Sequence, residues 1–148
     1  MVVIRGRPDL AFLLLVMQQM LNQRSARMSK KILVVDDDVL TVRLLTDKLI
    51  RAGHIVLTAA TGEEAIHQAI HERPDIVIMD IMLPDMQGSE VVKELQGHLD
   101  VIRHMKIFFL SGIISQQDDR GGKIKVGQEF YSAVAKPIDF DQVFDLIN

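Results

Sequence analysis

The chain has 148 residues, which is the size of a single domain with a short appendage. Hydrophobic residues make up 48% and charged residues 25% of it, a globular composition that excludes wholesale disorder. The 17 Lys and Arg against 20 Asp and Glu give a net charge of -3, so direct binding to nucleic acid is not expected, and the lack of cysteine excludes disulfides and thiolate metal sites.

The first 28 residues are expected to form an extension ahead of the main domain. Apolar residues recur there at helical spacing: Leu10, Leu13, Leu14, Met17 and Leu21. This pattern predicts an amphipathic helix from about residue 9 to residue 24, packed on the domain or on a second copy of the chain. The longest apolar run, residues 10–17, is shorter than the roughly 18 residues of a membrane span, so no span is predicted. The alternative is that the natural chain begins at Met28 and the assigned start is wrong, because residues 28–31 lie directly before the first predicted strand.

From Lys31 onward, short apolar runs alternate with helical patterns. The predicted strands are residues 32–35, 55–60, 76–79, 107–110 and 133–135. Helical patterns follow the first, second, third and fifth of these runs. Strands that are apolar on both faces and separated by helices imply a parallel sheet that is covered on both sides. We therefore expect an α/β fold with an open, doubly wound, five-stranded parallel sheet.

The segment from Ser115 to Phe130 is the weak part of this pattern. Gly121, Gly122 and Gly127 interrupt a polar stretch where the fourth helix would lie. Glycine costs about 1 kcal/mol per residue relative to alanine in a helix interior. The fourth helix is therefore expected to be irregular, that is, short, frayed or displaced.

Polar residues follow four of the predicted strands. Asp36 and Asp37 come after the first strand, Asp80 after the third, Ser111 after the fourth and Lys136 after the fifth. Ligands of open α/β sheets bind at the carboxyl ends of the strands, so these five side chains should gather at one edge. Clustered carboxylates repel one another unless a cation holds them, and a hard divalent ion, most simply Mg²⁺, matches their charge and their oxygen atoms.

These groups suit the transfer of a phosphoryl group. Its transition state spreads negative charge over three oxygens, which a metal ion, Lys136 and the hydroxyl of Ser111 can stabilise. No glycine-rich nucleotide-binding motif is present, so the nucleophile is expected on the protein. Asp80 is best placed for this role, because it ends a central apolar run and precedes a loop containing Pro84 and Gly88.

Residues 29–148 resemble the receiver domain of two-component response regulators, of the CheY-like superfamily. The motifs that carry the resemblance are ILVVDD at 32–37, DIVIMDIMLPDMQG at 75–88, FLSG at 109–112 and AKP at 135–137. The resemblance implies a flavodoxin-like sheet with strand order 2-1-3-4-5 and Asp80 as the phosphoacceptor. It also implies that Ser111 hydrogen-bonds a phosphoryl oxygen and that Lys136 pairs with the phosphoryl group, with a cis peptide before Pro137.

The same resemblance implies the Mg²⁺ ligands. Asp37, Asp80 and the backbone carbonyl of Met82 would coordinate the ion directly, and Asp36 would act largely through water. A histidine kinase or a histidine phosphotransfer protein would donate the phosphoryl group. A downstream target protein or a missing output domain would receive the signal, in the cytoplasm, and a homodimer is a further expectation. The domain would be a switch that assists its own phosphotransfer and dephosphorylation, and not an enzyme acting on a separate substrate.

One departure from the family pattern concerns the switch. The family often has an aromatic residue three positions before the lysine, and this chain has Ala133 there. Tyr131 lies two residues earlier on the same strand face, where it either substitutes for that aromatic residue or simply packs.

Two other functions remain open at this point. A pseudo-receiver would be an interaction module without phosphotransfer, and Ala133 and the glycine-rich segment favour it. A phosphatase of the haloacid dehalogenase type would use Asp36 as nucleophile and Asp38 as general acid, although Asp38 is more readily interpreted as a helix cap.

Overall fold

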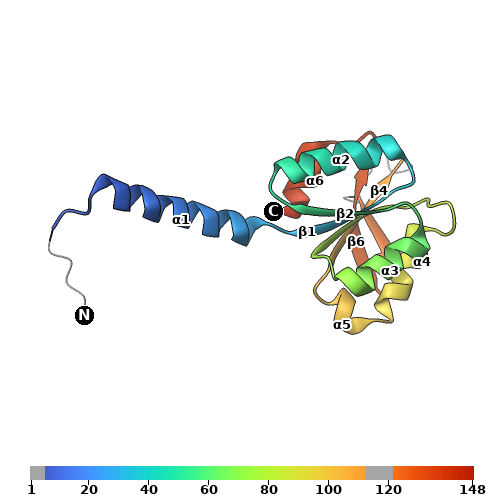
Figure 1. Ribbon diagram of the computed structural model, residues 1–148. Helices are drawn as coiled ribbons and strands as arrows, with labels where there is room; N and C mark the ends of the chain where they lie inside the picture. Colours follow the sequence, from blue (N-terminus) through green and yellow to red (C-terminus); the bar gives the residue numbers. More distant parts are fainter. Residues whose placement is uncertain (1–5, 113–121) are drawn as a thin grey trace.

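The computed structural model describes residues 6–112 and 122–148, with the backbone alone at residues 25–28. A six-stranded sheet forms the centre of the domain (Figure 1). Its strands are β1 (Lys31–Val35), β2 (Ile55–Ala59), β3 (Ile76–Asp80), β4 (Lys106–Ser111), β5 (Lys123–Val126) and β6 (Glu129–Ala135). Their order is β2-β1-β3-β4-β6-β5, and the first five in this order run parallel. These five strands confirm the predicted open, doubly wound α/β fold and its strand order.

Helices cover both faces of the sheet. On one face lie α2 (Val39–Arg51) and α6 (Phe140–Ile147), and on the other lie α3 (Gly62–Glu72), α4 (Gly88–Gln96) and α5 (Leu99–Ile102), as Figure 1 shows. The alternation of side chains along β1 explains why both faces need cover. Ile32 and Val34 join the core under α2 and α6, whereas Leu33 and Val35 join the core under α3 and α4, and all four are fully buried.

The sheet differs from expectation at one edge. Lys123–Val126 forms β5, which runs antiparallel to β6 and connects to it through a two-residue turn that begins with Gly127 at φ 62°. Between β4 and β6, the described residues contain this strand and no helix, and residues 113–121 lie outside the description. The expected irregular fourth helix falls largely on residues outside the description, and at Lys123–Val126 the alternation of charged and apolar residues favours a strand.

The N-terminal extension contains α1 (Leu10–Met28), a helix over the residues whose apolar spacing predicts one. The helix projects away from the sheet (Figure 1). Its large apolar side chains from Leu10 to Leu21 are exposed, so the expected packing on the domain does not occur. Packing on a second copy stays a prediction. Within the described residues, no helix combines the length and apolarity that a membrane crossing needs.

Candidate phosphorylation site

The register of the parallel strands brings the predicted site residues to one edge of the sheet. Asp36 and Asp37 follow β1, Asp80 ends the neighbouring β3, Ser111 ends β4 and Lys136 follows β6. The carboxyl ends of the neighbouring strands are aligned, because Val35 pairs with Met79, Asp80 with Leu110, and Ser111 with Ala135. All five strand-end residues predicted from the sequence therefore lie together.

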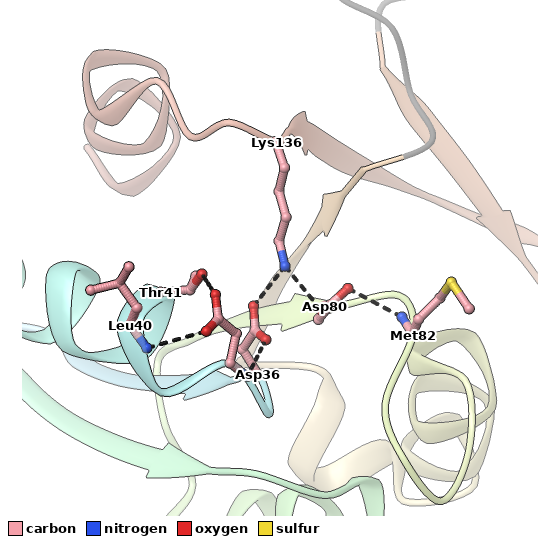
Figure 2. Close-up of polar contacts among 7 residues, drawn as sticks. Asp36, Leu40, Thr41, Asp80, Met82 and Lys136 are labelled. Carbon is pink, nitrogen blue, oxygen red and sulfur yellow. Dashed lines mark hydrogen bonds and ion pairs between the residues drawn. The ribbon is translucent and has the colours of Figure 1, made fainter.

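Lys136 connects two of the carboxylates. Its Nζ atom lies 2.8 Å from Oδ2 of Asp36 and 2.9 Å from Oδ2 of Asp80 (Figure 2). Asp36 is 2% exposed and Asp80 is 9% exposed, so the ammonium group compensates carboxylates that have little access to water. Burial by itself lowers the pKa of Lys136, but the hydrogen bonds with Asp36 and Asp80 outweigh it, so the pKa is raised above its usual value. The Lys136–Pro137 peptide is cis, as expected.

Backbone N–H groups hold the other oxygen of each carboxylate. Oδ1 of Asp36 accepts a hydrogen bond from the N–H of Asp38 at 2.9 Å, and Oδ1 of Asp80 accepts one from the N–H of Met82 at 3.2 Å. Each of the two carboxylates is therefore held in one orientation, between a backbone N–H group and the ammonium group of Lys136 (Figure 2).

Three carboxylates are close enough to share one cation. Asp36, Asp37 and Asp80 each place one carboxylate oxygen within 4.8 Å of the others. Oxygen ligands of this kind suit a hard ion such as Mg²⁺, which keeps several waters and takes few protein ligands. Met82 lies beside the cluster through its hydrogen bond to Asp80, while its side chain is exposed. The donor set therefore fits the ion that the sequence predicts.

Ser111 and Asp80 line the same cavity. This cavity has a volume of about 220 Å³, and its wall consists of Asp80, Ile81, Met82, Ser111, Gly112 and Lys136. Ser111 is almost completely buried at the end of β4. The cavity gives room for a phosphoryl group next to the Asp80 carboxylate, with a hydroxyl residue and an ammonium group on its wall.

The loop after β3 is held against α3 by residues to which the sequence analysis assigned no function. Asp85 accepts hydrogen bonds from the N–H groups of Gly62 at 2.7 Å and Glu63 at 3.0 Å, and these bonds lower its pKa. Gly88 begins α4 so close to β3 that a Cβ atom there would lie 2.5 Å from the backbone oxygen of Asp80. The Pro-Asp-x-x-Gly spacing of the loop was the sequence signal for the hydrogen bonds of Asp85 and for the close approach of Gly88 to β3.

Asp38 is a helix cap, as the sequence suggested. Its carboxylate accepts hydrogen bonds from Oγ1 of Thr41 at 2.6 Å and from the N–H of Leu40 at 3.3 Å. The bond from Thr41 is the main cause of its lowered pKa. The carboxylate is thus bound to the first turn of α2, which does not suit a general acid partner for Asp36.

Tyr131 packs into the domain. Its hydroxyl accepts a hydrogen bond from Nε2 of Gln96 at 3.0 Å, and its ring stands edge-on to Phe109, with 6.1 Å between the ring centroids. Ala133, at the position of the family's aromatic residue, is buried. Of the two roles that the sequence left open for Tyr131, these contacts favour packing.

An apolar surface adjoins the site. A cavity of about 330 Å³ is lined by Leu40, Thr41, Leu44, Lys136, Pro137, Ile138 and Phe140. Leu40 is 64% exposed, and Val39 and Leu44 are also exposed on α2. Large apolar side chains grouped beside a reactive site are typical of a surface that binds a partner.

Comparison with known proteins supports the family resemblance that the sequence motifs indicate. The sequence model of the family described as response regulator receiver domain matches residues 32–148. The alkaline phosphatase synthesis transcriptional regulatory protein PhoP of Bacillus subtilis is 41% identical over 97 residues, which are 66% of this chain and 38% of PhoP. The polar-differentiation response regulator DivK of Brucella anthropi is 31% identical over 121 residues, which are 81% of this chain and 94% of DivK. The chain thus spans well under half of PhoP and nearly all of DivK.

Solved structures share the fold. The receiver domain of the Francisella response regulator 1452 has a TM-score of 0.68 and 25% identity, covering 81% of this chain and 94% of that one. The receiver domain of a sensor histidine kinase from Pseudomonas aeruginosa, solved with magnesium coordinated in its active-site cleft, has a TM-score of 0.68 and 24% identity, covering 80% and 94%. This second likeness bears on the fold alone.

Proposed function

Because the chain belongs to the response regulator receiver family, it is a phosphoacceptor signalling domain of a two-component system, and we propose that Asp80 is the residue that accepts the phosphoryl group. The observation that carries this proposal is the position of Asp80 between Lys136 and the strand-end cavity. Asp36 is the more deeply buried of the two carboxylates that Lys136 binds, and it does not line that cavity. Asp37 is exposed and has no ion pair with Lys136.

The proposed reaction is a direct transfer to the carboxylate. A carboxylate oxygen of Asp80 attacks the phosphorus of a phosphohistidine, the new O–P bond forms as the P–N bond breaks, and the imidazole leaves with the bonding electron pair and is protonated. Lys136 then pairs with a phosphoryl oxygen, because the carboxylate that it contacts has become an acyl phosphate. Loss of the group to water would reverse the switch, and the same residues would assist that step.

Asp36, Asp37, Asp80 and the carbonyl of Met82 would hold Mg²⁺ in this domain. When bound, the ion neutralises the negative charge that develops on the transferred group. The charge balance of the site supports this assignment, since one ammonium group faces three carboxylates, two of which it contacts directly.

Ser111 is proposed as the residue that senses the phosphoryl group. It lies on the wall of the cavity beside Asp80, and a phosphoryl oxygen there would accept a hydrogen bond from its hydroxyl. The bond would favour a conformation in which Ser111 lies closer to Asp80. Phosphorylation would therefore act by shifting an equilibrium between two conformations and so change the contacts of the domain with other proteins.

The apolar surface of α2 is proposed as the docking site for the phosphodonor. Leu40 and Leu44 line a cavity whose wall also includes Lys136, and their exposed side chains carry no charge that would repel a phosphorylated partner. A helix of a histidine kinase or of a phosphotransfer protein fits such a surface, since helix faces pair through apolar side chains. The downstream partner is a target protein or an output domain, and a cytoplasmic location is part of the same proposal.

A homodimer through α1 is also proposed. The exposed apolar residues of α1 include Leu10, Leu14, Met17 and Leu21, which recur at helical spacing on one side of the helix. A second α1 would bury this stripe. Light scattering of the full chain and of a chain lacking residues 1–27 tests this assignment, and a monomer in both cases contradicts it.

The experiment that tests the proposed function is incubation with acetyl phosphate and Mg²⁺, followed by mass spectrometry. We expect the chain to gain one phosphoryl group and the Asp80→Asn variant to gain none. No gain in the parent chain would identify a pseudo-receiver. A gain that persists in Asp80→Asn would show that another residue is the acceptor. Hydrolysis of p-nitrophenyl phosphate that survives Asp80→Asn but is lost in Asp36→Asn would favour the phosphatase.

A further inference from the structure

The strand β5 forms an open edge of the sheet. It pairs with β6, and within residues 6–112 and 122–148 no strand runs along its outer side. An open edge presents backbone N–H and C=O groups that can pair with another extended segment. We propose that this edge binds an extended acidic segment of a partner protein, which adds a strand to the sheet beside β5.

The register of the hairpin identifies the backbone groups that would bind the segment. The N–H of Ala133 donates to the carbonyl of Gly122 across the hairpin. In an antiparallel pair, hydrogen-bonded positions alternate with positions whose N–H and C=O groups point away from the partner strand. Ile124 is therefore hydrogen-bonded to β6, whereas the backbone groups of Lys123 and Lys125 point outward. These two residues offer two donors and two acceptors at the spacing of a strand.

The side chains of β5 divide between the two faces of the sheet. Ile124 and Val126 join the core that includes α4. Lys123 and Lys125 are exposed on the opposite face, where Phe130 of β6 is 63% exposed and Nζ of Lys125 lies 5.6 Å from its ring centroid. A segment beside β5 would meet two ammonium groups and an aromatic ring on this face, which favours acidic side chains at alternate positions.

Charge distinguishes this occupant from a second copy of the chain. Two β5 strands paired edge to edge would bring the lysines of both copies together, and like charges across neighbouring strands are destabilising. Glu129 is the only acid in the hairpin sequence from Gly122 to Ala135. It lies opposite Val126, so the pleat places it on the face away from the lysines. The lysine face therefore attracts an acidic strand and repels a copy of itself.

Gln96 at the end of α4 holds the hairpin in place. Its Nε2 atom lies 3.0 Å from the carbonyl oxygen of Val126 and 3.0 Å from the hydroxyl of Tyr131. Gly127 lets this side chain approach the turn, because a Cβ atom there would lie 2.8 Å from Oε1 of Gln96. The edge is thus already ordered before a partner arrives, which reduces the entropy cost of binding.

The test is the binding of a fluorescein-labelled ten-residue peptide that alternates glutamate and valine, measured by fluorescence anisotropy with the full chain. We expect saturable binding, together with slower hydrogen exchange at the amides of Lys123 and Lys125. A peptide that alternates lysine and valine should bind at least about tenfold more weakly, a difference of about 1.4 kcal/mol. Absence of saturable binding of the glutamate peptide, or equal binding of both peptides, would overturn the proposal.

Two variants separate strand addition from simple charge attraction. Lys125→Pro removes one outward N–H while leaving the hydrogen bonds to β6, as proline on an edge strand can, and we expect at least about tenfold weaker binding of the glutamate peptide. The double variant Lys123→Glu, Lys125→Glu should lose that peptide and bind the lysine peptide. Unchanged binding in either variant contradicts the proposal, and circular dichroism reports whether each variant folds.

Two further outcomes are informative. Self-association that light scattering detects in the parent chain and that Lys125→Pro abolishes would show that a second copy, and not an acidic partner, occupies the edge. The peptide assay needs neither Mg²⁺ nor Asp80, so it gives the same result in Asp80→Asn if the proposal is correct. Failure of this proposal and failure of the proposed phosphorylation are therefore distinguishable.

Discussion

The Nζ atom of Lys136 lies 2.9 Å from Oδ2 of Asp80 although the two residues are 56 positions apart in the chain. Lys136 follows β6, which is separated from β3 by β4, and its long side chain spans that distance. The same ammonium group lies 2.8 Å from Oδ2 of Asp36. The ammonium group of Lys136 thus orients the carboxylate of Asp80, the proposed phosphoacceptor, and lies close enough to contact the oxygens of a phosphoryl group bound there.

Replacing Lys136 should slow phosphorylation. We expect the Lys136→Met variant to react with acetyl phosphate about 100-fold more slowly, because a preorganised positive charge beside the transferred group is lost. The rate of mass gain in the presence of Mg²⁺ measures this effect. Lys93→Met on the exposed side of α4 is the matched control and should react at the parent rate. A Lys136→Met rate within about twofold of the parent would contradict the assigned role.

Removing one carboxylate should weaken Mg²⁺ binding without unfolding the domain. For Asp37→Asn we expect at least about tenfold lower affinity in isothermal titration calorimetry, and little change in stability because Asp37 is exposed. Asp38→Ala is the opposite case. It removes the cap of α2 at a cost of about 1 kcal/mol in the free energy of unfolding and should leave the Mg²⁺ affinity unchanged. Equal affinities for parent and Asp37→Asn would exclude Asp37 as a ligand.

The apolar surface of α2 should matter only for a protein phosphodonor. We expect Leu40→Glu to slow phosphotransfer from phosphorylated histidine phosphotransfer domains at least about tenfold, because a charge enters the apolar contact. The rate with acetyl phosphate should stay the same. Ile55→Glu is the control, since Ile55 is also exposed but begins β2 at the opposite end of the sheet. An equal effect of both substitutions would argue against docking at α2.

Gly88 should tolerate no side chain. A Cβ atom at this position would lie 2.5 Å from the backbone oxygen of Asp80 and 3.2 Å from Cε1 of Phe109, so we expect Gly88→Ala to lower the free energy of unfolding by about 1–3 kcal/mol. Urea unfolding followed by circular dichroism measures this loss. Gly112→Ala is the matched control because a Cβ atom there would meet no atom within 4 Å. Similar losses for both variants would show that the close approach of α4 to β3 is not the cause.

The pH dependence of stability should include a contribution from His54. Burial, together with the charge of Lys30, lowers the pKa of His54, whose Nδ1 accepts a hydrogen bond from the N–H of Lys30 at 3.2 Å. The unfolded chain therefore binds the proton more tightly than the folded chain. The stabilisation that neutral His54 contributes is fully present above the unfolded pKa of about 6.5, and it is lost as the pH falls through the pKa of His54 in the folded chain. Urea unfolding at pH 7.5 and pH 5.5 should show a smaller decrease for His54→Gln than for the parent. Equal decreases would contradict this contribution.

Much of the fold could be predicted because its signals are local. A run such as Ile76–Met79 is apolar on both faces and ends at an acid, so both the strand and its carboxyl-end residue follow from a few neighbouring positions. The strand β5 could not be predicted in the same way. Its four residues alternate lysine with Ile124 and Val126, and the glycines around them are equally compatible with a loop, so pairing with β6 decides its conformation.

The chemical groups at the strand ends could be recognised without coordinates, because short patterns of apolar and polar residues mark where each strand ends and the order of the elements. The contacts between distant residues required the folded arrangement: Lys136 bridges Asp36 and Asp80, and Gln96 holds the hairpin of Tyr131. Each of these contacts joins residues more than 30 positions apart, and its distance depends on sheet register and helix packing. These are properties of the whole folded chain, since they arise only when every strand has its neighbours.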